Sequence, residues 1–273
     1  MKLVDASSYF DRTPILDPVT GAKLFLGQLD NYDDSKRDAS AAYRRVLSVR
    51  PGTAVPPVIK AFGSFWLVGT SEIDGLWEEH RAKYVLQRAT SGVYVGGLSE
   101  YLASATPTPV WASEFWEKDM KQLAASSTSP QKYQIYLPQG TSAPTRGVVW
   151  RAGVAYLILS VHSPASDFVL AECEKLEFGV ATATLTARSY NPVTGTYSSS
   201  APATAACQRI RWEALFDYTT QADAKFQEGD CTLALPSGTV ITTAHTLTLS
   251  GLAWTPLSVD EANGVVLVHG RPA

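Results

Sequence analysis

The stretch GVAYLILSV, residues 153–161, occurs again in the chain as GLAWTPLSV, residues 251–259. Both copies open with glycine, carry an aromatic residue three positions later and end in Leu-Ser-Val. The positions that define the repeat are Gly153 and Tyr156 in one copy and Gly251 and Trp254 in the other. Short runs of β-branched and aromatic residues are typical of strands, and the leading glycine is typical of a tight turn before the strand.

A Pro-x-Gly-Thr sequence precedes each copy. LPQGT at 137–141 matches LPSGT at 235–239, and each proline lies 15 residues before the glycine that opens its copy. The defining positions here are Pro138, Gly140, Pro236 and Gly238. Proline presets φ and glycine accepts a positive φ, so both sequences predict turns. Two blocks at one internal spacing indicate a duplication.

A weaker third copy is indicated near the start of the chain. RPGT at 50–53 precedes GSFWLV at 63–68, with 12 residues from proline to glycine. Gly63 opens this copy, and Trp66 stands at the offset of the other aromatic residues. The three opening glycines are 90 and 98 residues apart, about a third of the chain each.

Each copy continues through a polar turn into a second apolar strand, so the unit is predicted to be a hairpin. The near-identical sequences DPVTG at 17–21 and NPVTG at 191–195 are predicted to be hairpin tips. A lone hairpin is only marginally stable and must pack on other strands. The sequence therefore predicts a mainly β fold of tandem small barrels or sandwiches built from repeated hairpins, with one or two short helices.

One helix is expected over residues 114–125, capped by Ser113, because Trp116, Met120 and Leu123 fall on one face. Residues 76–88 fit a helix or a long strand, and their alignment with the repeat favours a strand.

Runs rich in Ser and Pro at 126–130 and 198–202 have linker composition, and residues 30–39 are expected to be a polar loop. These features predict an N-terminal β unit at 1–126 with the helix near its end, a second unit at 131–197 and a third at 203–273. The last two could also form one domain.

The composition gives little pull towards nucleic acid or anionic membranes, because 23 Lys and Arg are set against 26 Asp and Glu. Cys173, Cys207 and Cys231 are far apart and are expected to be buried, reduced thiols. No apolar run approaches 18 residues and the first residues lack the apolar core of a secretion signal, so we expect folding in a reducing cytoplasm.

No pattern of catalytic or metal-binding residues stands out. The four histidines, His80, His162, His245 and His269, occur singly. Glu172 with Glu174, or Asp74 with Glu78, could pair as in a glycosidase, although alternating Glu also suits the solvent side of a sheet. Arg44, Arg45 and Arg50 could contact phosphate, but a salt-bridged surface is favoured. We expect no enzymatic activity, no cofactor and no metal.

The repeated strand resembles head-tail joining proteins of tailed bacteriophages, the head-completion, stopper and tail-attachment group. The resemblance rests on Gly153, Tyr156, Ser160 and Val161 and on their counterparts Gly251, Trp254, Ser258 and Val259. It implies a virion protein assembled in the bacterial cytoplasm that forms a ring at the neck or tail. Its partners would be itself and other neck or tail proteins, with DNA passing without sequence-specific contact and no membrane. The alternative is a β-sandwich module that binds carbohydrate or hydrolyses glycosides.

Overall fold

The computed structural model describes residues 13–31, 44–72, 81–116, 132–162, 168–210, 230–262 and 264–273. Strands make up most of these residues, so the predicted mainly β fold is confirmed. Contacts divide the chain into two compact units. The first comprises Met1–Val93, Thr108–Ala143 and Ser160–Cys173, and the second comprises Tyr94–Pro107, Pro144–Leu159 and Glu174–Ala273.

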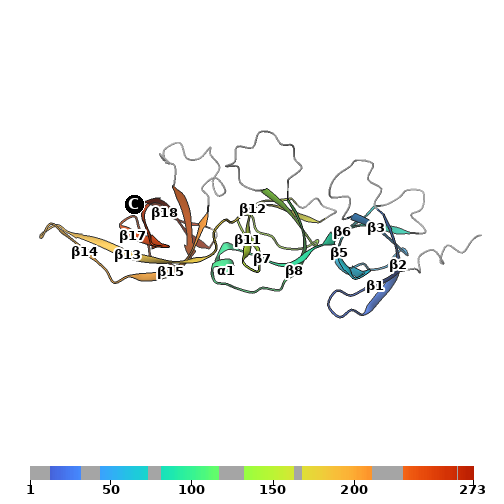
Figure 1. Cartoon of the computed structure of the whole chain (residues 1–273). Helices are drawn as coiled ribbons and strands as arrows, with labels where there is room; N and C mark the ends of the chain where they lie inside the picture. The colour runs from blue at the N-terminus through green and yellow to red at the C-terminus, as the bar shows by residue number, and fades with distance from the viewer. Residues whose placement is uncertain are drawn as a thin grey trace, which may run out of the picture. The chain divides into compact units, whose positions relative to one another are not determined.

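Barrel 1 is a closed antiparallel sheet, drawn in blue to cyan in Figure 1, with the strand order β1-β2-β3-β6-β5-β4. Its strands are β1 (Thr13–Leu16), β2 (Lys23–Asn31), β3 (Arg44–Val49), β4 (Val58–Ala61), β5 (Ser64–Glu72) and β6 (Ala82–Ala89). Aliphatic side chains and Trp66 fill its core. Side chains that alternate along each strand place one set inside the barrel and the other outside.

Barrel 2 closes in the order β7-β8-β9-β12-β11-β10. Its strands are β7 (Ser91–Gly96), β8 (Val110–Trp116), β9 (Lys132–Leu137), β10 (Val148–Arg151), β11 (Val154–His162) and β12 (Val169–Lys175). The helix α1 (Leu98–Leu102) lies between β7 and β8 in the chain.

Barrel 3 runs in the order β13-β15-β16-β19-β18-β17 and is closed by pairing of β13 with β17. Its strands are β13 (Ala181–Asn191), β15 (Ala203–Ile210), β16 (Cys231–Pro236), β17 (His245–Leu249), β18 (Leu252–Ala262) and β19 (Val265–Pro272). An additional strand, β14 (Thr196–Ser199), pairs with the end of β13.

The three barrels share one topology. In each, the first three strands form a meander, the last three form a second meander, and the first strand closes the barrel by pairing with the fourth barrel strand. The weak N-terminal copy is therefore a full repeat. Closure leaves no open edge on a barrel, which protects it from pairing with other chains.

The predicted hairpin, in which the repeated strand pairs with the strand after it, is present as β5–β6, β11–β12 and β18–β19. The tight turn expected at the opening glycine is also present, and it forms a further hairpin with the strand before it. The two residues of this turn both have positive φ: Phe62 (49°) and Gly63 (72°), Ala152 (43°) and Gly153 (82°), and Ser250 (51°) and Gly251 (80°). Consecutive positive φ values define the type I′ turn, whose twist matches that of paired strands. A buried aromatic residue faces a buried aliphatic residue across each hairpin: Trp66 and Ile59, Tyr156 and Val149, Trp254 and Leu247.

The Pro-x-Gly-Thr turns also recur, each directly after the third strand of its barrel. The N–H groups of Thr53, Thr141 and Thr239 donate to the carbonyls three residues earlier, at Arg50, Pro138 and Pro236. The glycines, Gly52, Gly140 and Gly238, have φ of 78°, 81° and 78°. Proline stands one position later in the first turn than in the others, and the stretch from the turn glycine to the opening glycine is 11 residues instead of 13, so both differences shorten the proline spacing of the N-terminal copy.

The two similar tips predicted at 17–21 and 191–195 are both hairpin tips. The Asp17 carboxylate accepts hydrogen bonds from the N–H groups of Val19 and Thr20, and the Asn191 side chain accepts the equivalent pair. Hydrogen bonds from Thr20 lower the pKa of Asp17 below its usual value. The tips connect the first strand of barrel 1 to β2 and β13 to β14, so they occupy corresponding places.

The predicted helix over 114–125 is wrong where the structure describes it. Ser113 to Trp116 belong to β8 and pair with β9, because pairing across the barrel outweighs the local helical spacing; residues 117–125 lie outside the described residues. In the segment 76–88, residues 82–88 are in β6, as favoured, and 76–80 lie outside the described residues.

Strand pairing groups the chain differently from the predicted segments 1–126, 131–197 and 203–273. The sheets span residues 13–89, 91–175 and 181–272, and a single residue, Thr90, joins β6 to β7. The Ser-rich run near 198–202 lies inside the third sheet because it forms an exposed strand and its exit turn. The linker-like run 126–130 lies outside the described residues. So does most of the loop expected at 30–39, of which residues 30 and 31 end β2.

In each unit, side chains bridge neighbouring sheets. In the first, Phe65 of β5 stacks on Trp111 of β8 with 3.7 Å between ring centroids, and the buried Gln87 side chain donates to the Ser113 hydroxyl. In the second, Leu98 and Leu102 of α1 pack in one cluster with residues of β10, β11, β15, β16 and β19. Apolar contacts therefore predominate in both bridges, with one buried hydrogen bond in the first.

Candidate functional site

The residues that define the repeat lie at turns, at strand ends and in the barrel cores. The glycines occupy turns that require positive φ, and the prolines lie at or beside strand ends. The aromatic members, Trp66, Tyr156 and Trp254, are buried. None of these residues forms part of a chemical site among the described residues.

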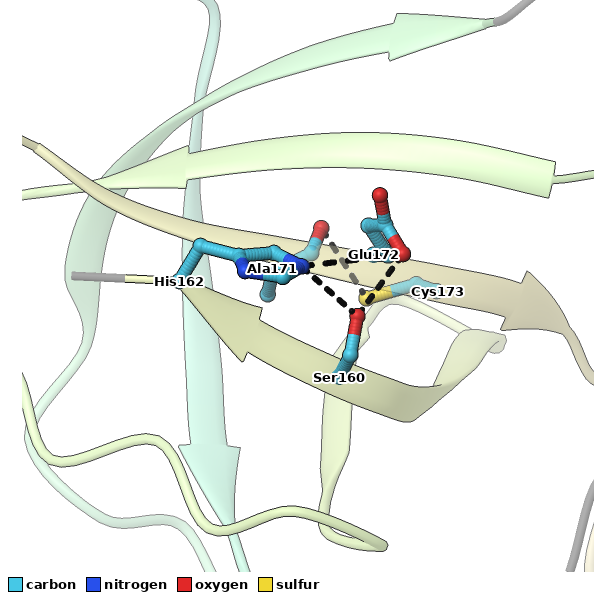
Figure 2. Close-up of polar contacts among 5 residues, drawn as sticks. All are labelled: Ser160, His162, Ala171, Glu172 and Cys173. Carbon is cyan, nitrogen blue, oxygen red and sulfur yellow. Dashed lines mark hydrogen bonds and ion pairs between the residues drawn. The ribbon is translucent and has the colours of Figure 1, made fainter. Parts of the chain in front are cut away.

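A polar cluster on barrel 2 brings together Ser160, His162 and Glu172 (Figure 2). Ser160 and His162 are two positions apart near the end of β11, so alternation places them on one face of the sheet. Glu172 lies on the neighbouring strand β12. Sequence reasoning singled out Glu172 only as a member of a carboxylate pair and gave Ser160 only a role in the repeat.

The geometry of this cluster differs from that of a hydrolase triad. The Ser160 hydroxyl donates to Glu172 Oε2 at 2.7 Å, while His162 Nε2 lies 3.2 Å from the same hydroxyl oxygen and 3.9 Å from Glu172 Oε2. In a triad the histidine accepts the serine proton and the acid binds the other ring nitrogen. Here one nitrogen faces both partners, so the serine proton is committed to the carboxylate.

The cluster is also open to solvent. The side chains of His162 and Glu172 are 57% and 46% exposed. Electrostatic catalysis needs a site from which water is excluded, and an exposed ion pair contributes little to binding or stability. The arrangement suits a polar tie between two strands.

The thiol beside the cluster is a weak nucleophile. Cys173 faces the other side of β12 and donates to the Ala171 carbonyl at 3.7 Å (Figure 2). Burial, with a smaller contribution from Glu172, raises the pKa of Cys173 to about 12. Burial likewise raises the pKa of Cys207 to about 12 and of Cys231 to about 11. The expectation of buried thiols is confirmed, and these protonated thiols do not supply a reactive thiolate.

The remaining candidates do not converge on a site among the described residues. Glu174 is buried whereas Glu172 is half exposed, and Asp74 and Glu78 lie outside the described residues, as does His80. Arg44 donates to the buried Gln87 amide instead of facing outwards as part of a phosphate site. In the part of the chain described, no group of three or more His, Cys, Asp or Glu could hold a metal ion.

Comparison with known proteins adds no relative. No family model, no curated protein and no solved structure matches the chain. Among the described residues, no helix has the length and apolar character needed to span a membrane.

A second polar cluster lies in barrel 3, where the start of β16 meets the end of β19. The Asp230 carboxylate accepts a bidentate pair of hydrogen bonds from Arg271, both at 2.8 Å, and lies 3.7 Å from His269 Nε2. Asp230 and His269 are only 3% and 4% exposed. The cluster joins the start of β16 to the end of β19, so its position indicates a structural role.

Acid should weaken barrel 3 through His269. Burial lowers the pKa of His269 from its ordinary 6.5 and outweighs the opposing effect of Asp230. The fold therefore favours the neutral ring, and that stabilisation is present above about pH 6.5 and is lost as the pH falls below it. We expect the thermal unfolding midpoint to fall over this range more steeply in the wild type than in His269→Gln. Equal slopes in the two proteins would contradict this assignment.

Among the described residues, one surface feature of barrel 3 has no counterpart in barrels 1 and 2. Residues 188–199, here called the arm, form a two-stranded hairpin from the end of β13 and β14, in which every residue is exposed. The rings of Tyr190 and Tyr197 contact each other on one face, with 5.1 Å between centroids. The Ser189 and Ser198 hydroxyls bond at 2.6 Å on the other face.

The sequence predicted the tip of this hairpin but not the arm. Its signal is the uncharged run from Ser189 to Gln208, which contains two tyrosines around the Asn191–Gly195 tip. A solvent-facing hairpin whose only charge is Arg188 at its base differs from the usual protected edge, which carries lysine or inward charges. The arm is therefore the strongest candidate for an interaction surface.

Proposed function

We propose that this chain is a structural protein of a tailed bacteriophage particle, located at the neck or tail, where it assembles with copies of itself and with neighbouring virion proteins. The observation that carries the proposal is the threefold recurrence of one closed six-stranded barrel. A repeated closed barrel supplies several similar outer surfaces in one chain, which suits a building block of a larger assembly.

The short connections support the same role. Thr90 alone separates β6 from β7, and the Phe65–Trp111 stack and the Gln87–Ser113 hydrogen bond lie beside this connection. Contacts of this kind between successive sheets suit a protein that bears load within a particle.

The polar clusters support a structural role over a catalytic one. The Ser160 proton is held by Glu172, and each oxygen of the Asp230 carboxylate accepts a hydrogen bond from Arg271. Both clusters tie strands together. The alternative, a module that binds or hydrolyses carbohydrate, has no specific observation in its favour among the described residues.

The test is the location of the protein in infected cells or induced lysogens that produce it. We expect the chain to co-sediment with tailed particles through a density gradient, and antibody labelling in electron microscopy to mark the neck or tail. Recovery of the protein only in the soluble fraction, with no copies in purified particles, would refute the proposal.

A further inference from the structure

We infer that the arm is a self-association surface, through which two copies of this chain pair β14 against β14 to form a four-stranded antiparallel sheet. The inference deepens the proposed function, because it names a contact that the assembly would use, and its biological setting rests on that function. The occupant of the exposed edge is a second copy of the chain.

The direction of the backbone groups in the arm follows from two hydrogen bonds at its base. The Ser200 N–H donates to the Ala187 carbonyl inside the hairpin, whereas the Arg188 N–H donates outwards to Ala244. Successive residues of a strand direct these groups to opposite sides. Within β14 the N–H and C=O groups of Tyr197 and Ser199 therefore point away from β13.

These outward groups have no strand beside them among the described residues. β14 is the terminal strand of its sheet and pairs only with β13. An edge of this kind is a template for another strand, and a two-stranded hairpin is only marginally stable until further strands join it. Adding a strand would satisfy the outward groups and stabilise the arm at the same time.

A second copy offers the same edge as a partner. The barrels described are all closed, so the arm supplies the exposed strand edges among the described sheets. Two β14 edges can pair about a twofold axis, which is the isologous contact typical of homodimers.

One register satisfies both outward residues at once. With Ser198 on the twofold axis, Tyr197 of each copy lies opposite Ser199 of the other. In each such pair, the N–H group of either residue donates a hydrogen bond to the carbonyl of the residue opposite. If Tyr197 lay on the axis instead, Ser199 would face Gly195, which belongs to the turn, and if Ser199 lay on the axis, Tyr197 would face Ala201, which lies beyond the end of β14. Residues on β14 carry no charge, so the arrangement places no like charges opposite each other.

The register makes a direct prediction about cross-linking. Ser198 would face its own counterpart in a non-hydrogen-bonded pair, where Cα atoms are about 4.5 Å apart, within the range that a disulfide spans. Under mild oxidation of the full chain at micromolar concentration, Ser198→Cys should form a disulfide-linked dimer. The described native cysteines are buried and should not compete.

The matched control is Ser189→Cys. Ser189 is exposed in the same arm and lies directly across the hairpin from Ser198, but on β13, away from the paired edge. We expect Ser198→Cys to cross-link at least about tenfold faster than Ser189→Cys, because pairing raises the local thiol concentration from micromolar towards millimolar. Equal rates for the two variants would overturn the inference.

A second pair of variants tests the edge without cysteine. Ser199→Pro removes one outward N–H and leaves the inward hydrogen bonds of the arm, whereas Ser199→Ala keeps that N–H. In sedimentation experiments the wild type and Ser199→Ala should dimerise with rising concentration, and Ser199→Pro should remain monomeric. The arm lies outside the barrels, so unchanged far-ultraviolet circular dichroism will show that the variants fold.

A wild type that stays monomeric at every concentration would overturn arm pairing but leave the proposed function intact if the chain is found in particles. Conversely, arm pairing in a protein that is absent from particles would refute the proposed function and leave the inference standing.

Discussion

Replacing Trp254 with alanine is expected to lower the free energy of unfolding of barrel 3 by about 3–5 kcal/mol. The side chain is 3% exposed and packs in the core cluster of that barrel with Leu247 across the hairpin. Loss of the indole leaves a cavity that surrounding strands of a closed barrel cannot collapse to fill. Denaturant unfolding, with hydrogen exchange to locate the effect in barrel 3, measures the change.

The equivalent tryptophan of barrel 1 provides a matched comparison. Trp66 Nε1 donates to the buried Ala61 carbonyl at 3.3 Å, whereas Trp254 Nε1 is buried with no hydrogen-bond partner among the described residues. Phenylalanine keeps a ring at either site but removes the N–H. We expect Trp66→Phe to cost about 1 kcal/mol more than Trp254→Phe, since only the first leaves an acceptor without its donor. The reverse order would contradict this reasoning.

Leu67→Ala should have the next largest effect, about 2–5 kcal/mol. Leu67 is fully buried in a cluster that contains residues of β4, β5 and β6 together with Trp111, Tyr136 and Phe168. A cavity there weakens both barrel 1 and the cluster that joins it to β8 and β9. We therefore expect barrel 1 to unfold in a separate, earlier step, visible as a second transition in calorimetry.

Leu24→Ala is the control for this prediction. Leu24 lies on β2 of the same barrel and is 43% exposed, whereas Leu67 is fully buried. The same chemical change at this position should alter stability by no more than about 0.5 kcal/mol. A comparable loss in both variants would show that the cluster around Leu67 does not couple the two sheets.

The turn at the start of each repeated strand could be predicted from sequence because its signals are local. A type I′ turn demands positive φ at two adjacent residues, so Gly153 and Gly251 stand at fixed offsets from a buried aromatic residue. The N-terminal copy was harder to align, since its proline is shifted by one position in the turn while Gly52 holds the required conformation.

Closure of the barrels lay beyond sequence reasoning. It depends on pairs such as Leu16 with Lys60 and Ala183 with Leu249, which are far apart in the chain and carry no distinctive residues. Local patterns were also misleading at Ser113–Trp116, where helical spacing coincides with a strand. Conversely, α1 was missed although Glu100 accepts a hydrogen bond from the Gly97 N–H at 2.7 Å, a capping contact with a readable spacing.

The two candidate sites also differ in how far the sequence could predict them. The pairing of Ser160 with Glu172 needs two strands in register, and neither residue type at its position predicts the other. The arm left a compositional trace, the absence of charge over 189–208, but its exposure depends on β13 running past the end of the barrel.

The connection between the first two strands of each barrel takes three different forms on one framework. In barrel 1 it is the short turn at Asp17–Gly21, in barrel 2 it contains α1, and in barrel 3 it is the arm. The strand order of each barrel is the same despite these differences, so this connection tolerates added residues without loss of the fold. It is therefore the place to graft a foreign peptide for display, and the exposed turn around Val19 is the shortest of the three forms.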